Sequence, residues 1–67
     1  MRQKQEIEWI PILEELPDLY ESVLLRTNYE GTFIYQYGEY WGFICGEHRF
    51  GYNNEYEFDY VTHWARI

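Results

Sequence analysis

The chain has 67 residues, a formal net charge of −7 and a 22% share of aromatic residues that includes eight Tyr. This length allows one small domain, which buries only about 60% of the surface that its unfolded chain exposes. A single Cys excludes a disulfide within the chain, and no apolar run approaches the roughly 18 residues of a membrane-spanning helix. No basic stretch precedes an apolar one near the start, so we expect no secretory signal and a cytosolic protein.

Acidic residues dominate the charge, because 12 Asp and Glu stand against five Lys and Arg. A chain without a basic stripe lacks the electrostatic attraction that drives nucleic-acid binding, and we expect no direct contact with nucleic acid. Anionic membrane surfaces are disfavoured for the same reason. The charge favours a protein partner with a basic surface, although it also serves simply to keep a Tyr-rich domain soluble.

The first part of the chain predicts little regular structure. Residues 1–8 are polar and are expected to fray. Residues 9–12 (WIPI) are apolar and extended, and Pro11 confines them to a sheet edge or to a cover over the core. Residues 13–16 are expected to form one helical turn that ends at Pro17.

Three strands follow in the prediction, over residues 22–27, 32–37 and 40–45, rich in β-branched and aromatic residues. A loop over 28–31 and a two-residue turn of type II′ at Gly38-Glu39 connect them into an antiparallel meander. The turn places Tyr37 opposite Tyr40, and the loop pairs Leu25 with Ile34 and Leu24 with Tyr35. The predicted core face then carries Val23, Leu25, Ile34, Trp41 and Phe43.

The opposite face of this meander carries four aromatic side chains, from Phe33, Tyr35, Tyr37 and Tyr40. Three interpretations stay open. The chain's own ends cover the face as a second layer, the face binds another protein or a second copy of the chain, or it stacks nucleic-acid bases. The third is disfavoured because only Arg26 lies nearby to meet phosphate.

The last third of the chain predicts a loop over 46–54, a strand over 55–60 and a final extended segment over 61–67. Strict alternation over 55–60 places acidic and aromatic side chains on opposite faces. The acidic row consists of Glu55, Glu57 and Asp59, and Glu47 extends it from the loop. Such a row of carboxylates suits an Arg- and Lys-lined groove that otherwise holds phosphates. Alternatively, it is the polar face of an amphipathic strand.

The candidates for catalysis and metal binding are weak. Cys45 and His48 form a C-x-x-H pair with Glu47 beside it, but zinc needs about four ligands. A nucleophilic pair of Cys45 with His48 or His63 lacks an orienting third group and a cleft. We therefore predict no catalytic residue, no metal and no cofactor, and we expect a protein that is not an enzyme.

The two ends of the chain carry motifs that resemble a known family. Residues 9–17 (WIPILEELP) look like a W-I-x-V-x-x-x-L-P start, and residues 61–64 resemble the beginning of a V-T-H-W-x-P close. This pattern is similar to that of a small domain family of unknown function carried mainly by phages and prophages, and the resemblance spans residues 9–64. Two features depart from it, since Ala65 and Arg66 stand where the family has a proline after the final Trp, and residues 19–21 replace a glycine turn.

The resemblance implies a phage origin, a small β-rich fold and residence in the cytoplasm of the bacterial host, but no activity. It implies structural roles for Trp9, Val61, His63 and Trp64, with the two tryptophans packed together.

Our expectation for the fold is a single, mainly β domain over residues 1–67, a small antiparallel meander with a closing C-terminal strand. Our leading functional hypothesis is an acidic phage or mobile-element protein that blocks a basic, nucleic-acid-handling surface of a host protein. It takes the form of an anti-defence protein such as an anti-CRISPR inhibitor, acting by DNA mimicry. The second hypothesis is an assembly module that dimerises through its aromatic face, and the third is a binder of single-stranded nucleic acid or nucleotides.

Overall fold

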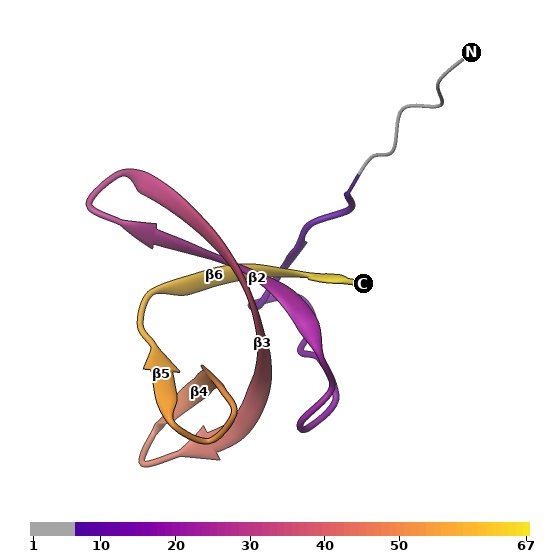
Figure 1. Ribbon diagram of the computed structural model, residues 1–67, viewed down its shortest axis with the longest axis vertical. Helices are drawn as coiled ribbons and strands as arrows, with labels where there is room; N and C mark the ends of the chain where they lie inside the picture. The colour runs from indigo at the N-terminus through magenta and orange to yellow at the C-terminus, as the bar shows by residue number, and fades with distance from the viewer. Residues whose placement is uncertain (1–6) are drawn as a thin grey trace.

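A computed structural model of the chain describes residues 7–67, and all of their regular structure is β (Figure 1). The predicted frayed tail, residues 1–8, lies mostly outside the described residues. The strands are β1 (Ile10–Pro11), β2 (Val23–Tyr29), β3 (Thr32–Ile44), β4 (Glu47–Tyr52), β5 (Tyr56–Phe58) and β6 (Val61–Arg66). They form one open antiparallel sheet in the order β1-β6-β2-β3-β4-β5. The predicted mainly β fold is confirmed, and no helix long and apolar enough to cross a membrane occurs in residues 7–67.

The largest departure from the predicted meander lies at Gly38-Glu39, where no turn forms. β3 runs unbroken through this pair for 13 residues, and Gly38 lacks the positive φ that a type II′ turn needs at its first position. Gly38 is instead a point of close approach, because a Cβ there would lie 2.6 Å from Leu25 Cδ1 and 2.8 Å from the carbonyl oxygen of Gly51. The prediction of a turn was wrong because glycine serves close packing as well as turns.

The turns of the first two hairpins, between β2 and β3 and between β3 and β4, both use an X-Gly pair with positive φ. Glu30 and Gly31 have φ angles of 52° and 86°, and Cys45 and Gly46 have 52° and 83°. Positive φ at both central residues is the signature of the two-residue type I′ turn, whose twist matches that of paired strands. The loop predicted over 28–31 therefore shrinks to its last two residues, and the loop predicted over 46–54 contains β4 instead.

The shorter first turn shifts the register of β2 and β3. Leu25 lies opposite Gln36 rather than Ile34, and Leu24 lies opposite Tyr37 rather than Tyr35. Each residue of β2 has thus moved two positions along β3, which leaves the faces of residues 23–37 unchanged because side chains alternate with a period of two.

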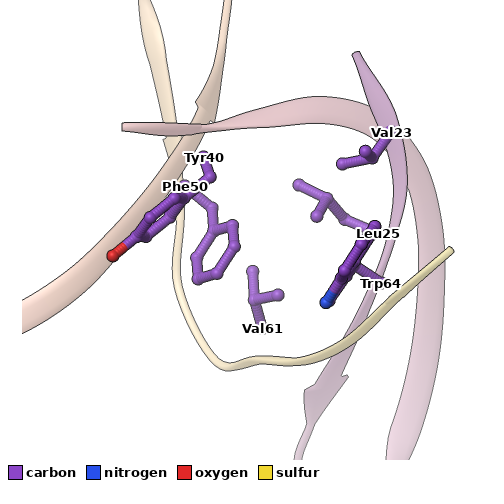
Figure 2. Packing of buried hydrophobic residues seen from close by; sticks show 6 residues of the cluster. All are labelled: Val23, Leu25, Tyr40, Phe50, Val61 and Trp64. Atoms are coloured by element: carbon purple, nitrogen blue, oxygen red, sulfur yellow. The ribbon is translucent and has the colours of Figure 1, made fainter. Parts of the chain in front are cut away.

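The core lies inside the curl of the bent sheet (Figure 2). It is formed by residues from β2, β3, β4 and β6, namely Val23, Leu25, Tyr40, Phe50, Val61 and Trp64. Val23 and Leu25 were predicted in the core correctly, whereas Ile34 and Phe43 are exposed and Trp41 is half-buried. Ile34 and Phe43 are exposed because the long strand β3 extends beyond the core at both of its ends. The strand also has a bulge between Tyr40 and Gly42, which disturbs the alternation of its side chains.

The segment before β2 covers one side of this core. β1 pairs with β6, with Ile10 opposite Trp64, and Ile10, Ile12 and Leu16 pack on the core. The indole of Trp64 donates a hydrogen bond to the carbonyl oxygen of Glu15 at 2.8 Å. The expected helical turn is a single hydrogen-bonded turn, in which the amide of Glu14 donates to the carbonyl of Pro11 at 3.0 Å.

Trp9 does not join Trp64 in the core, contrary to the expected pair. Ile10 faces the same side of the sheet as Trp64, so its neighbour Trp9 is directed to the opposite face by strand alternation. There its ring packs against Tyr35, with 5.5 Å between the ring centroids.

Candidate functional site

The outer face of the sheet, opposite the core, carries a row of exposed aromatic residues. Phe33, Tyr35 and Tyr37 occupy alternate positions of β3 and are 48%, 55% and 62% exposed. Three of the four residues of the predicted aromatic face thus share one face. The fourth, Tyr40, is only 7% exposed and lies in the core. Without a turn at Gly38-Glu39, residues 37 and 40 have opposite parity along one strand, and their side chains point to opposite faces.

Arg26 lies at the centre of this face. It pairs with Tyr35 of β3 and with His63 of β6. Its guanidinium carbon lies 4.5 Å from the ring centroid of Phe33 and 5.5 Å from that of Trp9. Stacking on two rings holds the guanidinium by cation–π attraction and leaves its edge for hydrogen bonds. We call Trp9, Arg26, Phe33, Tyr35, Tyr37 and His63 the aromatic–arginine face.

His63 accepts a hydrogen bond that requires its neutral form. Nη2 of Arg26 donates to Nδ1 of His63 at 3.1 Å. Burial lowers the pKa of His63, and the nearby charge of Arg26 lowers it further, while Glu14 opposes both effects. The imidazole therefore stays neutral near pH 7 and keeps one ring nitrogen free of a proton to accept from Arg26.

The predicted acidic row is partly gathered, but around a groove and not along a strand. Glu47, Glu57 and Asp59 line a groove of about 330 Å³ between β4 and the corner that joins β5 to β6. Glu55 lies outside it, in the turn before β5. The expected straight row was wrong because β5 has only three residues, from Tyr56 to Phe58.

Arg49, which sequence reasoning missed, lies among these carboxylates. Its Nη1 donates to Oε2 of Glu57 at 2.8 Å, and Nη2 lies 3.5 Å from Oε2 of Glu47. The hydrogen bond to Glu57 and the charge of that carboxylate raise the pKa of Arg49. Arg49 fell in a predicted loop, so only its strand pairing in β4 could have placed it beside Glu57. Two of the four predicted carboxylates consequently share one arginine, whose single charge offsets only one of their two.

The residues considered for catalysis and metal binding are scattered. Cys45 is exposed in the turn between β3 and β4, and Nδ1 of His48 lies 2.8 Å from the hydroxyl of Tyr40. His63 belongs to the aromatic–arginine face instead. Between residues 7 and 67, no group of three or more His, Cys, Asp or Glu side chains is placed to hold a metal ion.

Comparison with known proteins gives a family and no function. The family model of a protein of unknown function (DUF551) matches residues 8–67. The chain belongs to this family. The family resemblance drawn from the end motifs is thereby confirmed. No curated protein and no solved structure matches the chain.

Proposed function

We propose that this chain is a non-enzymatic binding protein that contacts a partner protein through the aromatic–arginine face. The observation that carries the proposal is the row of Phe33, Tyr35 and Tyr37, all about half exposed on one sheet face. Aromatic residues and Arg are enriched at protein interfaces and dominate their binding energy. Contiguous patches of exposed apolar residues mark interaction sites, whereas single apolar residues scattered over a surface do not.

The charge of the chain favours a basic partner. The three arginines of residues 7–67 are all engaged: Arg26 by His63 and two rings, Arg49 by Glu47 and Glu57, and Arg66 by Glu15 at 3.1 Å. Most carboxylates of this part of the chain are therefore available to cations of a partner. With a net charge of −7, electrostatic attraction speeds encounter with a basic surface and discriminates against acidic ones.

In its specific form, the proposal is an anti-defence protein of phage or mobile-element origin. It occupies a basic groove in which a host nuclease complex, such as a CRISPR effector, holds nucleic acid. Tyr35 and Tyr37 would anchor the contact, and the carboxylates of Glu55 and Asp59 would take the place of phosphates. Small size, acidity and the phage-type resemblance of the end motifs support this form.

A competition experiment tests the proposal. Purified nucleic-acid-handling complexes are titrated with the labelled chain in the presence and absence of their DNA. We expect saturable binding that DNA competes away and that salt weakens. The double substitution Tyr35→Ala with Tyr37→Ala should weaken it at least about tenfold. The control Tyr56→Ala removes an aromatic side chain from β5 that is 61% exposed, close to the 62% of Tyr37.

Equal binding by the double variant and the control would contradict a role for the face. Unchanged binding after Glu55, Glu57 and Asp59 are all replaced by Lys would contradict the replacement of phosphates.

The same exposed face also supports a second candidate, an assembly module that pairs with another copy of itself. A dimeric mass in light scattering that returns to monomer in the Tyr35→Ala, Tyr37→Ala variant would favour this candidate. Binding of single-stranded oligonucleotide at low salt, seen as an anisotropy change, would favour the nucleic-acid hypothesis instead.

A further inference from the structure

A second groove lies on the inner side of the hairpin formed by β2 and β3, away from the aromatic–arginine face. It has a volume of about 230 Å³ and is bounded by the hairpin and by the corner between β5 and β6. In Figure 1 this hairpin projects beyond the rest of the sheet. We call it the tyrosine groove, and its lining includes Tyr29, Ile34, Phe58 and Tyr60 together with the carboxylates of Glu57 and Asp59.

The two tyrosines of this groove are held by tertiary contacts. Their ring centroids lie 5.8 Å apart at an interplanar angle of 56°, although the two residues are 31 positions apart in the chain. The amide of Asn28 donates to the carbonyl oxygen of Tyr60 at 3.0 Å, which ties the β5–β6 corner to β2. Both rings are nevertheless exposed, so together they form an aromatic wall that is accessible to solvent.

Among the charged groups around the groove, the carboxylate of Asp59 is the one that forms no ion pair within residues 7–67. The hydroxyl of Thr27 donates to the carbonyl of Ile34 at 3.3 Å, and Glu57 is paired with Arg49 at 2.8 Å. Asp59 is exposed and has no ion-pair partner among residues 7–67. A ligand that fills the groove and carries a cation close to Asp59 would therefore have favourable charge complementarity.

We propose that the tyrosine groove binds an extended, proline-containing segment of a partner protein with a Lys or Arg at its flank. Aromatic-lined grooves suit segments in the polyproline II conformation, because the proline rings pack on aromatic side chains and the segment is already extended before binding. Its carbonyl groups have no internal hydrogen bonds and are open to tyrosine hydroxyls. The basic flank meets Asp59. This binding goes beyond the proposed function, since its aromatic contacts come from Tyr29 and Tyr60 rather than from Tyr35 and Tyr37, and only Asp59 is common to both proposals.

The experiment is a fluorescence-anisotropy titration of the whole chain against labelled peptides of about ten residues, roughly 31 Å long in this conformation. The first peptide is proline-rich with an Arg-Lys flank, the second has each proline replaced by alanine, and the third has a Glu-Glu flank. We expect saturable binding of the first and binding at least about tenfold weaker of the other two.

Variants then locate the binding on the chain. Tyr29→Ser should weaken binding of the first peptide at least about tenfold, while the control Tyr52→Ser should not. Tyr29 and Tyr52 are 52% and 51% exposed, and only Tyr29 lines the groove. Asp59→Asn should reduce the salt dependence, with Glu55→Gln as its control. The Tyr35→Ala, Tyr37→Ala variant should bind the peptide normally, which separates this proposal from the proposed function.

Three results of the peptide titrations would overturn the proposal. These are the absence of saturable binding to the first peptide, equal binding of the alanine peptide, and equal losses in Tyr29→Ser and Tyr52→Ser. A dimer in light scattering that Tyr29→Ser abolishes would assign the groove to a second copy of the chain and would likewise overturn it.

Discussion

Arg26 and His63 are hydrogen-bonded across neighbouring strands, 37 positions apart in the chain, with 3.1 Å between Nη2 and Nδ1. The bond requires an imidazole without a proton on Nδ1, and both burial and Arg26 itself lower the pKa of His63. The outer face of the sheet therefore carries a titratable group whose protonation opposes the folded state.

The pH dependence of stability should reveal this bond. A histidine with a lowered folded-state pKa binds a proton more readily in the unfolded chain, so the free energy of unfolding falls as the pH drops below about 6.5. The His63→Gln variant should lose part of this dependence between about pH 7 and 5. Thermal unfolding at a series of pH values measures it, and His48→Gln is the control. A parallel pH profile in wild type and His63→Gln would contradict the prediction.

The stacking of Arg26 between Trp9 and Phe33 should depend on the planar guanidinium. Arg26→Lys keeps the charge but loses the flat surface that packs on both rings. We expect a loss of about 1 kcal/mol in the free energy of unfolding, the size of one or two cation–π contacts. Urea denaturation measures it, and a variant as stable as wild type would show that charge alone suffices.

The close packing at Gly38 predicts which substitutions the bend in β3 tolerates. Gly38→Asn would be mild in a hairpin turn, because Asn accepts positive φ. Inside the bend it should cost about 2–3 kcal/mol, because any Cβ meets Leu25 and the Gly51 carbonyl. Gly46→Asn is the matched control, since Gly46 has a φ of 83° and open space around it. Equal midpoints in urea for both variants would contradict the packing argument.

Arg49 should act against the binding of a basic partner. Arg49→Gln frees the carboxylates of Glu47 and Glu57 and makes the chain more acidic by one charge. If these carboxylates contact the partner, binding should tighten and its salt dependence should steepen. Affinities measured at two salt concentrations test this, with Arg66→Gln as a control of the same charge change. An equal effect of both variants would point to net charge rather than to the groove.

The aromatic face shows how far sequence patterns reach. Alternation along residues 33–37 predicted correctly that Phe33, Tyr35 and Tyr37 share a face, because neighbouring positions of one strand are related by a local geometric rule. Tyr40 was misplaced because its face depends on whether residues 38 and 39 turn or continue. That choice is decided by Leu25 and Gly51, which pack against Gly38 from other strands.

The acidic residues show the same limit. Their number and the resulting charge of −7 follow from the sequence, but the arginine that pairs with them does not, since Arg49 reaches Glu57 only through the pairing of β4 and β5.

Taken by itself, the sequence determined that this protein is a small, acidic, mainly β member of its family, because composition, alternation and end motifs are local properties of the chain. Only the tertiary structure decided where a long strand bends, which tyrosines are buried and which carboxylates are paired with an arginine. Those outcomes depend on contacts between residues far apart in the sequence, and the packing energy of such contacts outweighs the turn preference of a single Gly-X pair.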